Sequence, residues 1–173
     1  IYFPKNYRNW KRLDNGPLRT TFALTYDTWQ AGNIPVSVTK TISLDAGSQL
    51  NKMEVQYTFK GDQLPVVTGI VKRKEAGTVL LDEKNGVMGY WEPQHGDDGT
   101  LGLGCVFPAE VPGMKTDDVH LLSPGKAGSK QPYVYYTGAA WSKGGKVASA
   151  EEWFHYLETF SQKIRQPLKV TIQ

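Results

Sequence analysis

Apolar and polar residues alternate along much of the chain, which is the period expected of half-buried β-strands. One parity from 18 to 26 carries Leu18, Phe22, Leu24 and Tyr26, and the other carries polar or small residues. The alternation recurs from 36 to 44, after Gly32 and Asn33, and from 53 to 59, after a turn at 45–48. The pattern predicts three amphipathic strands, the first two joined as a hairpin.

Shorter runs rich in β-branched and aromatic residues follow, at 66–71, 78–81, 87–91, 101–107, 119–122 and 133–137. The run 66–71 is apolar on both faces, which favours a central strand. Short, evenly spaced strands separated by turn residues are typical of a sandwich or barrel. Gly102 and Gly104 lie inside one of these runs. They favour a β-bulge or a close approach of the backbone over a phosphate-binding loop.

One helix is predicted near the end of the chain. Ser149 and Glu152 form a capping box, and Pro167 ends the helix before a last strand from Leu168 to Ile172. The apolar stripe consists of Trp153, Leu157, Phe160 and Ile164, with His155 off the stripe and expected at the surface. The chain is therefore predicted to be one domain over residues 1–173, an antiparallel β-sandwich with a C-terminal amphipathic helix packed on a sheet.

Composition excludes several classes of protein. Twenty Lys and Arg against seventeen Asp and Glu give a net charge of +3, and the cations are scattered, so nucleic acid is not an expected partner. One cysteine rules out an intramolecular disulfide, and no Cys or His pair has metal-ligand spacing, so neither metal nor cofactor is expected. No apolar run approaches the roughly 18 residues that cross a bilayer, so no membrane partner is expected.

The chain begins with Ile1 instead of Met. We expect a matured product or an excerpt of a longer protein, with a possible N-terminal companion fragment. Such a fragment would pair with an exposed strand edge, because an unpaired edge favours association.

The segment 90–99 joins aromatic residues at a strand end to a polar loop, where binding sites are common. Trp91 offers a face for sugar C–H groups, and Glu92 and His95 offer partners for hydroxyls, so the composition suits a carbohydrate. The alternative is a bulged loop with Trp91 in the core and solvated acids.

Three further residues are candidates for charge chemistry. His120 has the right side chain for a general acid or base, although a lone histidine is more often structural. Lys72 and Arg19 are candidates to neutralise a uronate carboxylate, as is Lys40, which shares parity with an apolar face. For the lysines, the alternative is an alkyl stem that covers apolar surface while the ammonium reaches water.

A second aromatic stretch spans 133–141. Tyr135 shares a face with Tyr133, and Tyr136 shares the other face with Val134, so one aromatic set is a candidate lining for a groove. Core packing on both sides of a central strand is the competing interpretation.

Six segments in order resemble the bacterial family catalogued as domain of unknown function 4861: 13–20, 42–48, 69–73, 90–93, 136–141 and 148–153. The resemblance implies an exported protein, secreted or periplasmic, found alongside enzymes that degrade pectin and other acidic polysaccharides. It also implies a sandwich like that of galactose mutarotase and several polysaccharide lyases. Members are usually longer than this chain, and the resemblance implies that this chain corresponds to their C-terminal part.

Two functions follow as hypotheses. The first is an enzyme, hydrolase or lyase, acting on uronate-containing oligosaccharides such as those of pectin. In an elimination, Arg19 or Lys72 would neutralise the carboxylate and His120 or Tyr135 would take the C5 proton. The substrate-binding residues would be Lys72, Trp91, Glu92, His95 and Trp141. The second is a non-catalytic glycan-binding module.

Overall fold

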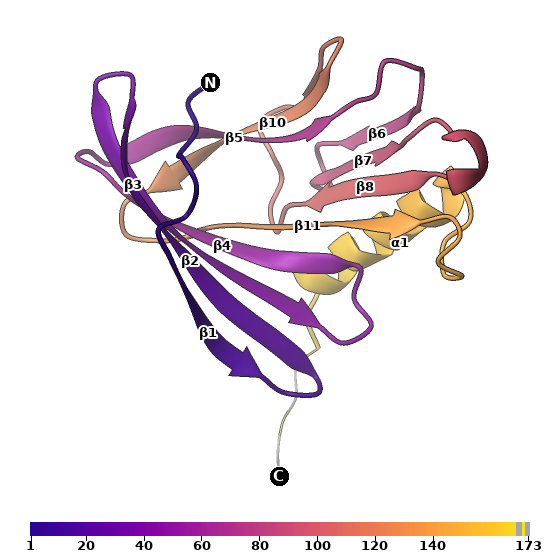
Figure 1. Cartoon of the computed structure of the whole chain (residues 1–173), viewed down its shortest axis with the longest axis horizontal. Coiled ribbons are helices and arrows are strands. Elements are labelled where there is room, and N and C mark those ends of the chain that lie inside the picture. Colours follow the sequence, from indigo (N-terminus) through magenta and orange to yellow (C-terminus); the bar gives the residue numbers. More distant parts are fainter. Residues whose placement is uncertain (169–170, 172–173) are drawn as a thin grey trace. The chain divides into compact units, whose positions relative to one another are not determined.

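The computed structural model describes residues 1–168 and 171. Contacts divide the chain into two compact units, the first formed by 1–67 and 124–137, the second by 68–123 and 138 onward. The chain passes between the units within β5 (Gln63–Val71), β10 (His120–Gly128) and β11 (Tyr133–Trp141) (Figure 1). The units are described separately below.

The first unit is built on long antiparallel strands. β1 (Asn9–Asn15), β2 (Arg19–Ala31), β3 (Ile34–Asp45) and β4 (Leu50–Thr58) follow one another in the sheet, and the first residues of β11 come next (Figure 1). Gly32 and Gly47 take positive φ values of 65° and 80° in the tight turns, a conformation that favours glycine. The three predicted amphipathic strands and the hairpin are confirmed.

Lys40 projects from the apolar face of this sheet. Cross-strand pairing sets it between Leu24 and Val55, and its ammonium lies 5.0 Å from the centre of the Tyr26 ring. Burial lowers the pKa of Lys40 and raises that of Tyr26, because both charged forms lose solvation. Lys40 is therefore a half-buried cation held against an aromatic ring.

The second unit holds two groups of strands. β6 (Thr78–Asp82), β7 (Val87–Trp91), β8 (Leu101–Val106) and the last residues of β11 lie in the order β11-β8-β7-β6. A 3-10 helix, η1 (Gly96–Asp98), stands between β7 and β8. The short β9 (Lys115–Thr116) pairs with the start of β10, and β10 pairs with β5.

The prediction that 66–71 forms a central strand is wrong. β5 is an edge strand of the three-stranded sheet β5-β10-β9. Its second row of apolar side chains is not covered: Val67 is 38% exposed and Val71 is 61% exposed. A run that is apolar on both faces does not by itself distinguish a covered central strand from an edge strand with surface valines.

The helix α1 (Ala150–Arg165) begins and ends where the sequence predicts. Ser149 Oγ accepts a hydrogen bond from the Glu152 amide at 3.2 Å, and the Glu152 carboxylate accepts from the Ala148 amide at 2.7 Å. Trp153 and Leu157 are fully buried, while His155 is exposed as expected. Residues 169, 170 and 172 of the predicted last strand, Leu168 to Ile172, lie outside the described ranges.

α1 packs against β7 and β8 at positions that lack side chains (Figure 1). A Cβ at Gly102 would lie 2.8 Å from the Trp153 ring, and one at Gly104 would lie 2.6 Å from Leu157 Cδ2. The predicted role of these glycines in a close approach is confirmed, and the backbone approaches helix side chains.

Candidate functional site

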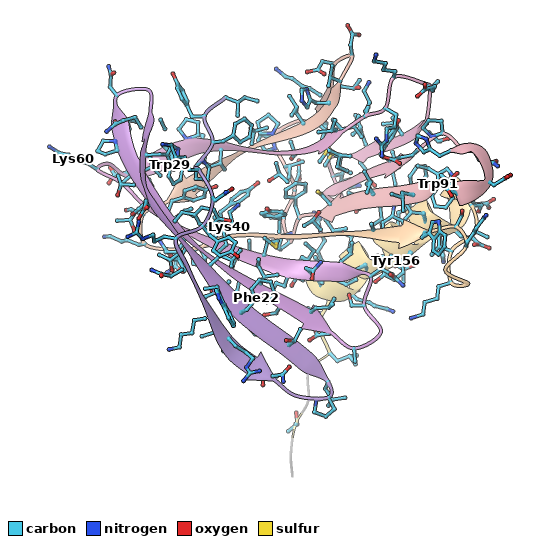
Figure 2. All side chains as sticks on the ribbon, in the orientation of Figure 1. Phe22, Trp29, Lys40, Lys60, Trp91 and Tyr156 are labelled. Carbon is cyan, nitrogen blue, oxygen red and sulfur yellow. The ribbon has the colours of Figure 1, made fainter. Side chains whose placement is uncertain are left out.

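The β11-β8-β7-β6 strands of the second unit have two unlike faces. Trp91 pairs with Gly102, and Gly102 lies under Trp153, so the Trp91 side chain is on the face that α1 covers (Figure 2). Glu92 comes one residue later, and its amide donates to the carbonyl of Leu101 at 2.9 Å. Because side chains alternate along a strand, Glu92 and Leu101 point to the opposite face.

Trp141 belongs to the same face as Glu92. The Ser142 amide donates to the Thr100 carbonyl at 2.9 Å, which sets Trp141 opposite Leu101 in the neighbouring strand. Trp141 is 49% exposed, and its ring nitrogen donates to the Asp98 carbonyl at 2.8 Å. This bond fixes one edge of the indole and leaves much of the ring in contact with solvent.

The carboxylate of Glu92 is buried and only half satisfied. The residue is 4% exposed, and Oε1 accepts from Arg73 Nε at 2.9 Å. Within the described part of the chain, no group donates a hydrogen bond to the buried Oε2. Burying a carboxylate is costly unless each oxygen has a partner, so Oε2 marks a place where a donor is missing.

His95 stands beside the unpartnered oxygen. Its Nε2 lies 3.8 Å from Glu92 Oε2, which is too long for a hydrogen bond, and its side chain is 46% exposed. The loop is held by a pairing of His95 with Gly99 and by the Asp98 amide, which donates to the His95 carbonyl at 2.8 Å. Lys143 adds a hydrogen bond from its ammonium to the Asp97 carbonyl.

The structure places Glu92 and Trp141, two of the predicted binding residues, on one face of the sheet. It sets His95 beside Glu92 and adds Arg73. It does not bring Trp91 to them, because Trp91 is half-buried on the α1 face. Its predicted role in stacking on sugar remains a prediction.

Lys72 and His120 meet at a second cluster in the same unit. The Lys72 amide donates to the Val119 carbonyl at 2.7 Å, and the Lys72 ammonium donates to Thr116 Oγ1 at 3.0 Å. His120 Nδ1 lies 3.3 Å from Asp117 Oδ1, and the His120 side chain is 40% exposed. A carboxylate at Nδ1 orients the ring and leaves Nε2 for chemistry.

Asp117 is itself fixed by the backbone. Its Oδ1 accepts from the amides of Val119 at 2.8 Å and His120 at 2.6 Å. These two amides, with a smaller contribution from the His120 side chain, hold the pKa of Asp117 below its usual range. Asp117 is therefore a charged acceptor that anchors the start of β10.

The other two predicted catalytic residues, Arg19 and Tyr135, belong to the first unit. Arg19 donates from Nε and Nη2 to the two oxygens of Asp45, at 2.5 and 2.9 Å. The pair lowers the pKa of Asp45 and raises that of Arg19. The ring centre of Tyr135 lies 5.8 Å from that of Tyr133. The catalytic roles of both residues remain predictions.

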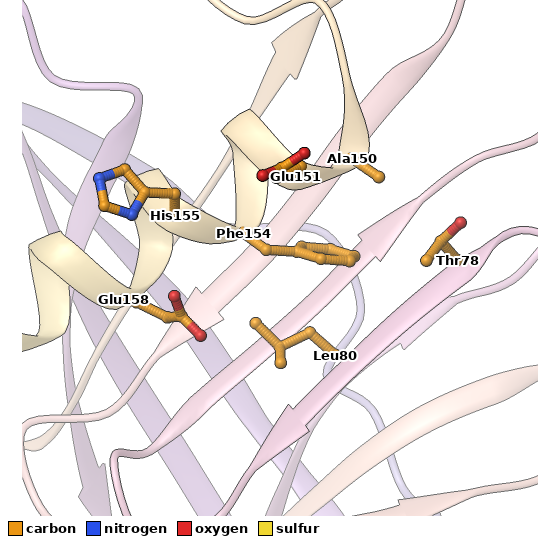
Figure 3. A pocket seen from close by; sticks show the side chains of 7 residues that line it. All are labelled: Thr78, Leu80, Ala150, Glu151, Phe154, His155 and Glu158. Carbon is orange, nitrogen blue, oxygen red and sulfur yellow. The ribbon is translucent and has the colours of Figure 1, made fainter.

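A groove between α1 and β6 has a different character (Figure 3). Figure 3 shows Phe154 reaching from α1 toward Leu80, with Glu151, His155 and Glu158 along the helix. The groove has an apolar floor and an acidic rim, and its lining residues include no Lys or Arg. This charge opposes an anionic ligand.

Two searches of the described residues gave negative results. No group of three or more His, Cys, Asp or Glu side chains in residues 1–168 and 171 has an arrangement that could hold a metal ion. None of the helices in that part of the chain is both long and apolar enough to cross a membrane.

Arg73 is the site residue that the sequence did not single out for chemistry. It follows Lys72 at the end of a predicted strand, and a cation at a strand end is the signal that could have drawn attention to it. Its partner Glu92 is 19 positions away, so the pair is visible only in the fold.

The fold and the sequence now define the class of protein. The fold is mainly β, with antiparallel sheets and one C-terminal helix, which confirms the predicted fold class. The chain belongs to the family described as domain of unknown function 4861, which it matches over residues 1–170.

The chain is similar to a known protein sequence and to a solved structure. An uncharacterized protein, P7, of Formosa agariphila is 30% identical over 180 residues, which cover 99% of this chain and 44% of that protein. The chain thus spans less than half the length of this relative. A putative kojibiose phosphorylase from the human microbiome shares the fold, with a TM-score of 0.58 and 7% identity over 84% of this chain and 21% of that one.

Proposed function

We propose that the domain binds uronate-containing oligosaccharides on the face of the second unit that carries Glu92 and Trp141, as part of a carbohydrate-active protein. One observation carries the proposal: a half-exposed tryptophan lies on the same sheet face as the Arg73–Glu92 pair. An exposed indole stacks on the C–H surface of a sugar, and the charged pair offers a donor and an acceptor for its polar groups.

The comparisons support a sugar ligand. One solved protein with this fold is named as a putative kojibiose phosphorylase, and kojibiose is a sugar. The family resemblance adds acidic polysaccharides and export, so we also propose a secreted or periplasmic location. Pectin is the proposed source of the oligosaccharide.

Binding to a panel of uronate oligosaccharides, measured by calorimetry, tests the proposal. Trp141→Ala removes the stacking surface and is expected to weaken binding about tenfold. The matched control is Trp10→Ala, because Trp10 is 67% exposed but lies on β1 of the first unit. Wild-type protein that binds no member of the panel contradicts the proposal, as does equal loss in both variants.

A second candidate function is cleavage by β-elimination, favoured by the Asp117–His120 pair beside Lys72. In this reaction His120 Nε2 would take the C5 proton of a uronate, and Lys72 would neutralise its carboxylate. The electron pair of the C5–H bond forms a C4–C5 double bond as the C4–O bond breaks. The leaving oxygen keeps the electron pair of that bond and takes up a proton from water.

New ultraviolet absorbance on mixing the protein with polygalacturonate is the expected sign of elimination, and it should be lost in His120→Ala. The matched control is His155→Ala, since His155 is an exposed histidine on α1. Arg19→Ala and Tyr135→Phe test the two predicted catalytic residues of the first unit in the same assay. New reducing ends without absorbance would indicate hydrolysis, and neither signal would leave a binding module.

A further inference from the structure

We infer that Arg73, oriented by Glu92, is an anion-binding site for the carboxylate of an acidic sugar. The inference rests on the proposed function and names the group that selects the ligand. Arg19 takes no part in this site, although it forms an ion pair with Asp45 as Arg73 does with Glu92.

The two arginines differ in how much of the guanidinium is occupied. Arg19 donates hydrogen bonds from both Nε and Nη2 to Asp45, so this side of its guanidinium already binds a carboxylate. Arg73 gives only Nε to Glu92 in the part of the chain that the structure describes, and its side chain is 50% exposed. Its two terminal nitrogens are therefore available for a carboxylate, which arginine binds with two parallel hydrogen bonds.

Glu92 acts as a positioning residue for this site. The carboxylate is buried and Oε1 accepts a hydrogen bond from Nε, so one edge of the guanidinium is held by an acceptor that is shielded from solvent. An arginine that is fixed before binding loses less side-chain entropy when the ligand arrives.

The local charge stays positive despite Glu92. Arg73 stands between Lys72 and Lys74 in the chain. Lys72 bonds to the neutral hydroxyl of Thr116, so its charge is not cancelled there. Glu75 follows Lys74, so this segment and Glu92 together hold three cations and two carboxylates. The remaining positive charge attracts an anionic ligand, in contrast to the acidic groove beside α1.

The unpartnered oxygen of Glu92 indicates what else the ligand carries. Oε2 is buried without a donor, and a uronate has hydroxyl groups close to its carboxylate. One ligand thus supplies both an anion for Arg73 and an O–H donor for Glu92. His95, 3.8 Å from Oε2 and 46% exposed, is the side chain that would move to admit the hydroxyl.

The experiment compares oligogalacturonate with its methyl ester, which has the same backbone but no charge. Wild-type protein is expected to bind the acid about tenfold more tightly than the ester. Arg73→Gln should lose this preference and bind both forms as wild type binds the ester. Lys60→Gln, the control, removes one charge from an exposed lysine of the first unit and should keep the preference.

The outcomes separate this inference from the proposed function. Equal wild-type binding of acid and ester overturns the Arg73 site and leaves sugar binding intact. A preference that survives Arg73→Gln also overturns the site. Wild type that binds neither form, nor any other uronate oligosaccharide, overturns both proposals.

Two further variants guard against a folding defect. Arg73→Lys keeps the charge but cannot form a two-point contact, so part of the preference should remain. Glu92→Gln keeps an oxygen for Nε but removes the ionic anchor, and it should reduce the preference for the acid more than the affinity for the ester. Circular dichroism establishes that each variant is folded before binding is measured.

Discussion

Arg73 donates to Glu92 across 2.9 Å, although the two side chains are exposed to very different degrees, 50% for Arg73 and 4% for Glu92. Water can solvate Arg73 if its partner is lost, but the Glu92 carboxylate is largely shielded from water. The two partners are therefore not equivalent in their effect on stability.

Removing Arg73 should cost more stability than removing Glu92. Arg73→Met leaves a buried carboxylate with no donor, and we expect a loss of about 2 kcal/mol or more. Glu92→Met leaves only a half-exposed guanidinium that turns to water, and we expect less than about 1 kcal/mol. Urea unfolding measures both.

An exposed ion pair provides the control. Arg8 and Asp27 are 3.5 Å apart with side chains 69% and 71% exposed, so Arg8→Met should change stability by less than about 0.5 kcal/mol. Equal losses for Arg73→Met and Glu92→Met would show that Glu92 is not an uncompensated buried charge.

The packing of α1 gives a second prediction. A Cβ at Gly102 would lie 2.8 Å from ring atoms of both Trp153 and Trp91, and Trp153 is fully buried. Gly102→Ala should therefore destabilise the protein by about 1–3 kcal/mol in urea unfolding. Gly128→Ala is the control, because its added Cβ meets nothing within 4 Å. If both variants unfold at the same urea concentration, the close approach of helix and strand is wrong.

The sequence predicted elements whose causes are local. Strand 87–91 and the helix start at Ser149 follow from residue types within a few positions, through β-forming residues and capping. β1 was not predicted, since all its residues are exposed and it lacks an apolar face. Such a strand is held by backbone hydrogen bonds to β2, and these bonds impose no pattern of apolar and polar residues on its sequence.

The site needed information that local patterns do not contain. Trp91 and Trp141 looked equivalent in sequence, and the cross-strand register sets them on opposite faces. The Arg73–Glu92 pair likewise depends on the fold of the strands between its two members. The residue types of the loop at 92–99 were enough to predict a candidate site there. Which side chains meet in it depends on the pairing between strands.

Lys40 should be a source of instability at neutral pH. It is charged and half-buried, so Lys40→Met is expected to stabilise the protein by up to about 1 kcal/mol, a modest gain because solvent still screens the ammonium. Lys60→Met is the control, because Lys60 is exposed (Figure 2), and it should change stability by less than about 0.5 kcal/mol.

The gain should depend on pH. Burial lowers the pKa of Lys40 in the folded protein below the value of about 10.4 in the unfolded chain. Between these two values the unfolded chain binds more protons, so wild-type stability rises with pH relative to Lys40→Met, and the gain from the substitution shrinks. A destabilised Lys40→Met would mean that the contact with Tyr26 outweighs desolvation.

Asp117 should protect the start of β10 in a way that acid removes. Asp117→Ala takes away the acceptor for the amides of Val119 and His120, so both amides should exchange with solvent faster, as measured by NMR. Asp118→Ala is the matched control, since it changes the neighbouring exposed acid.

The pKa of Asp117 is lowered in the folded protein, so its contribution is complete above the unfolded value of about 3.9 and is lost only as pH falls through the lower folded value. Protection of the two amides, corrected for intrinsic exchange, should therefore persist through the usual range of aspartate titration. Loss of protection already near pH 5 would show that another group holds this turn.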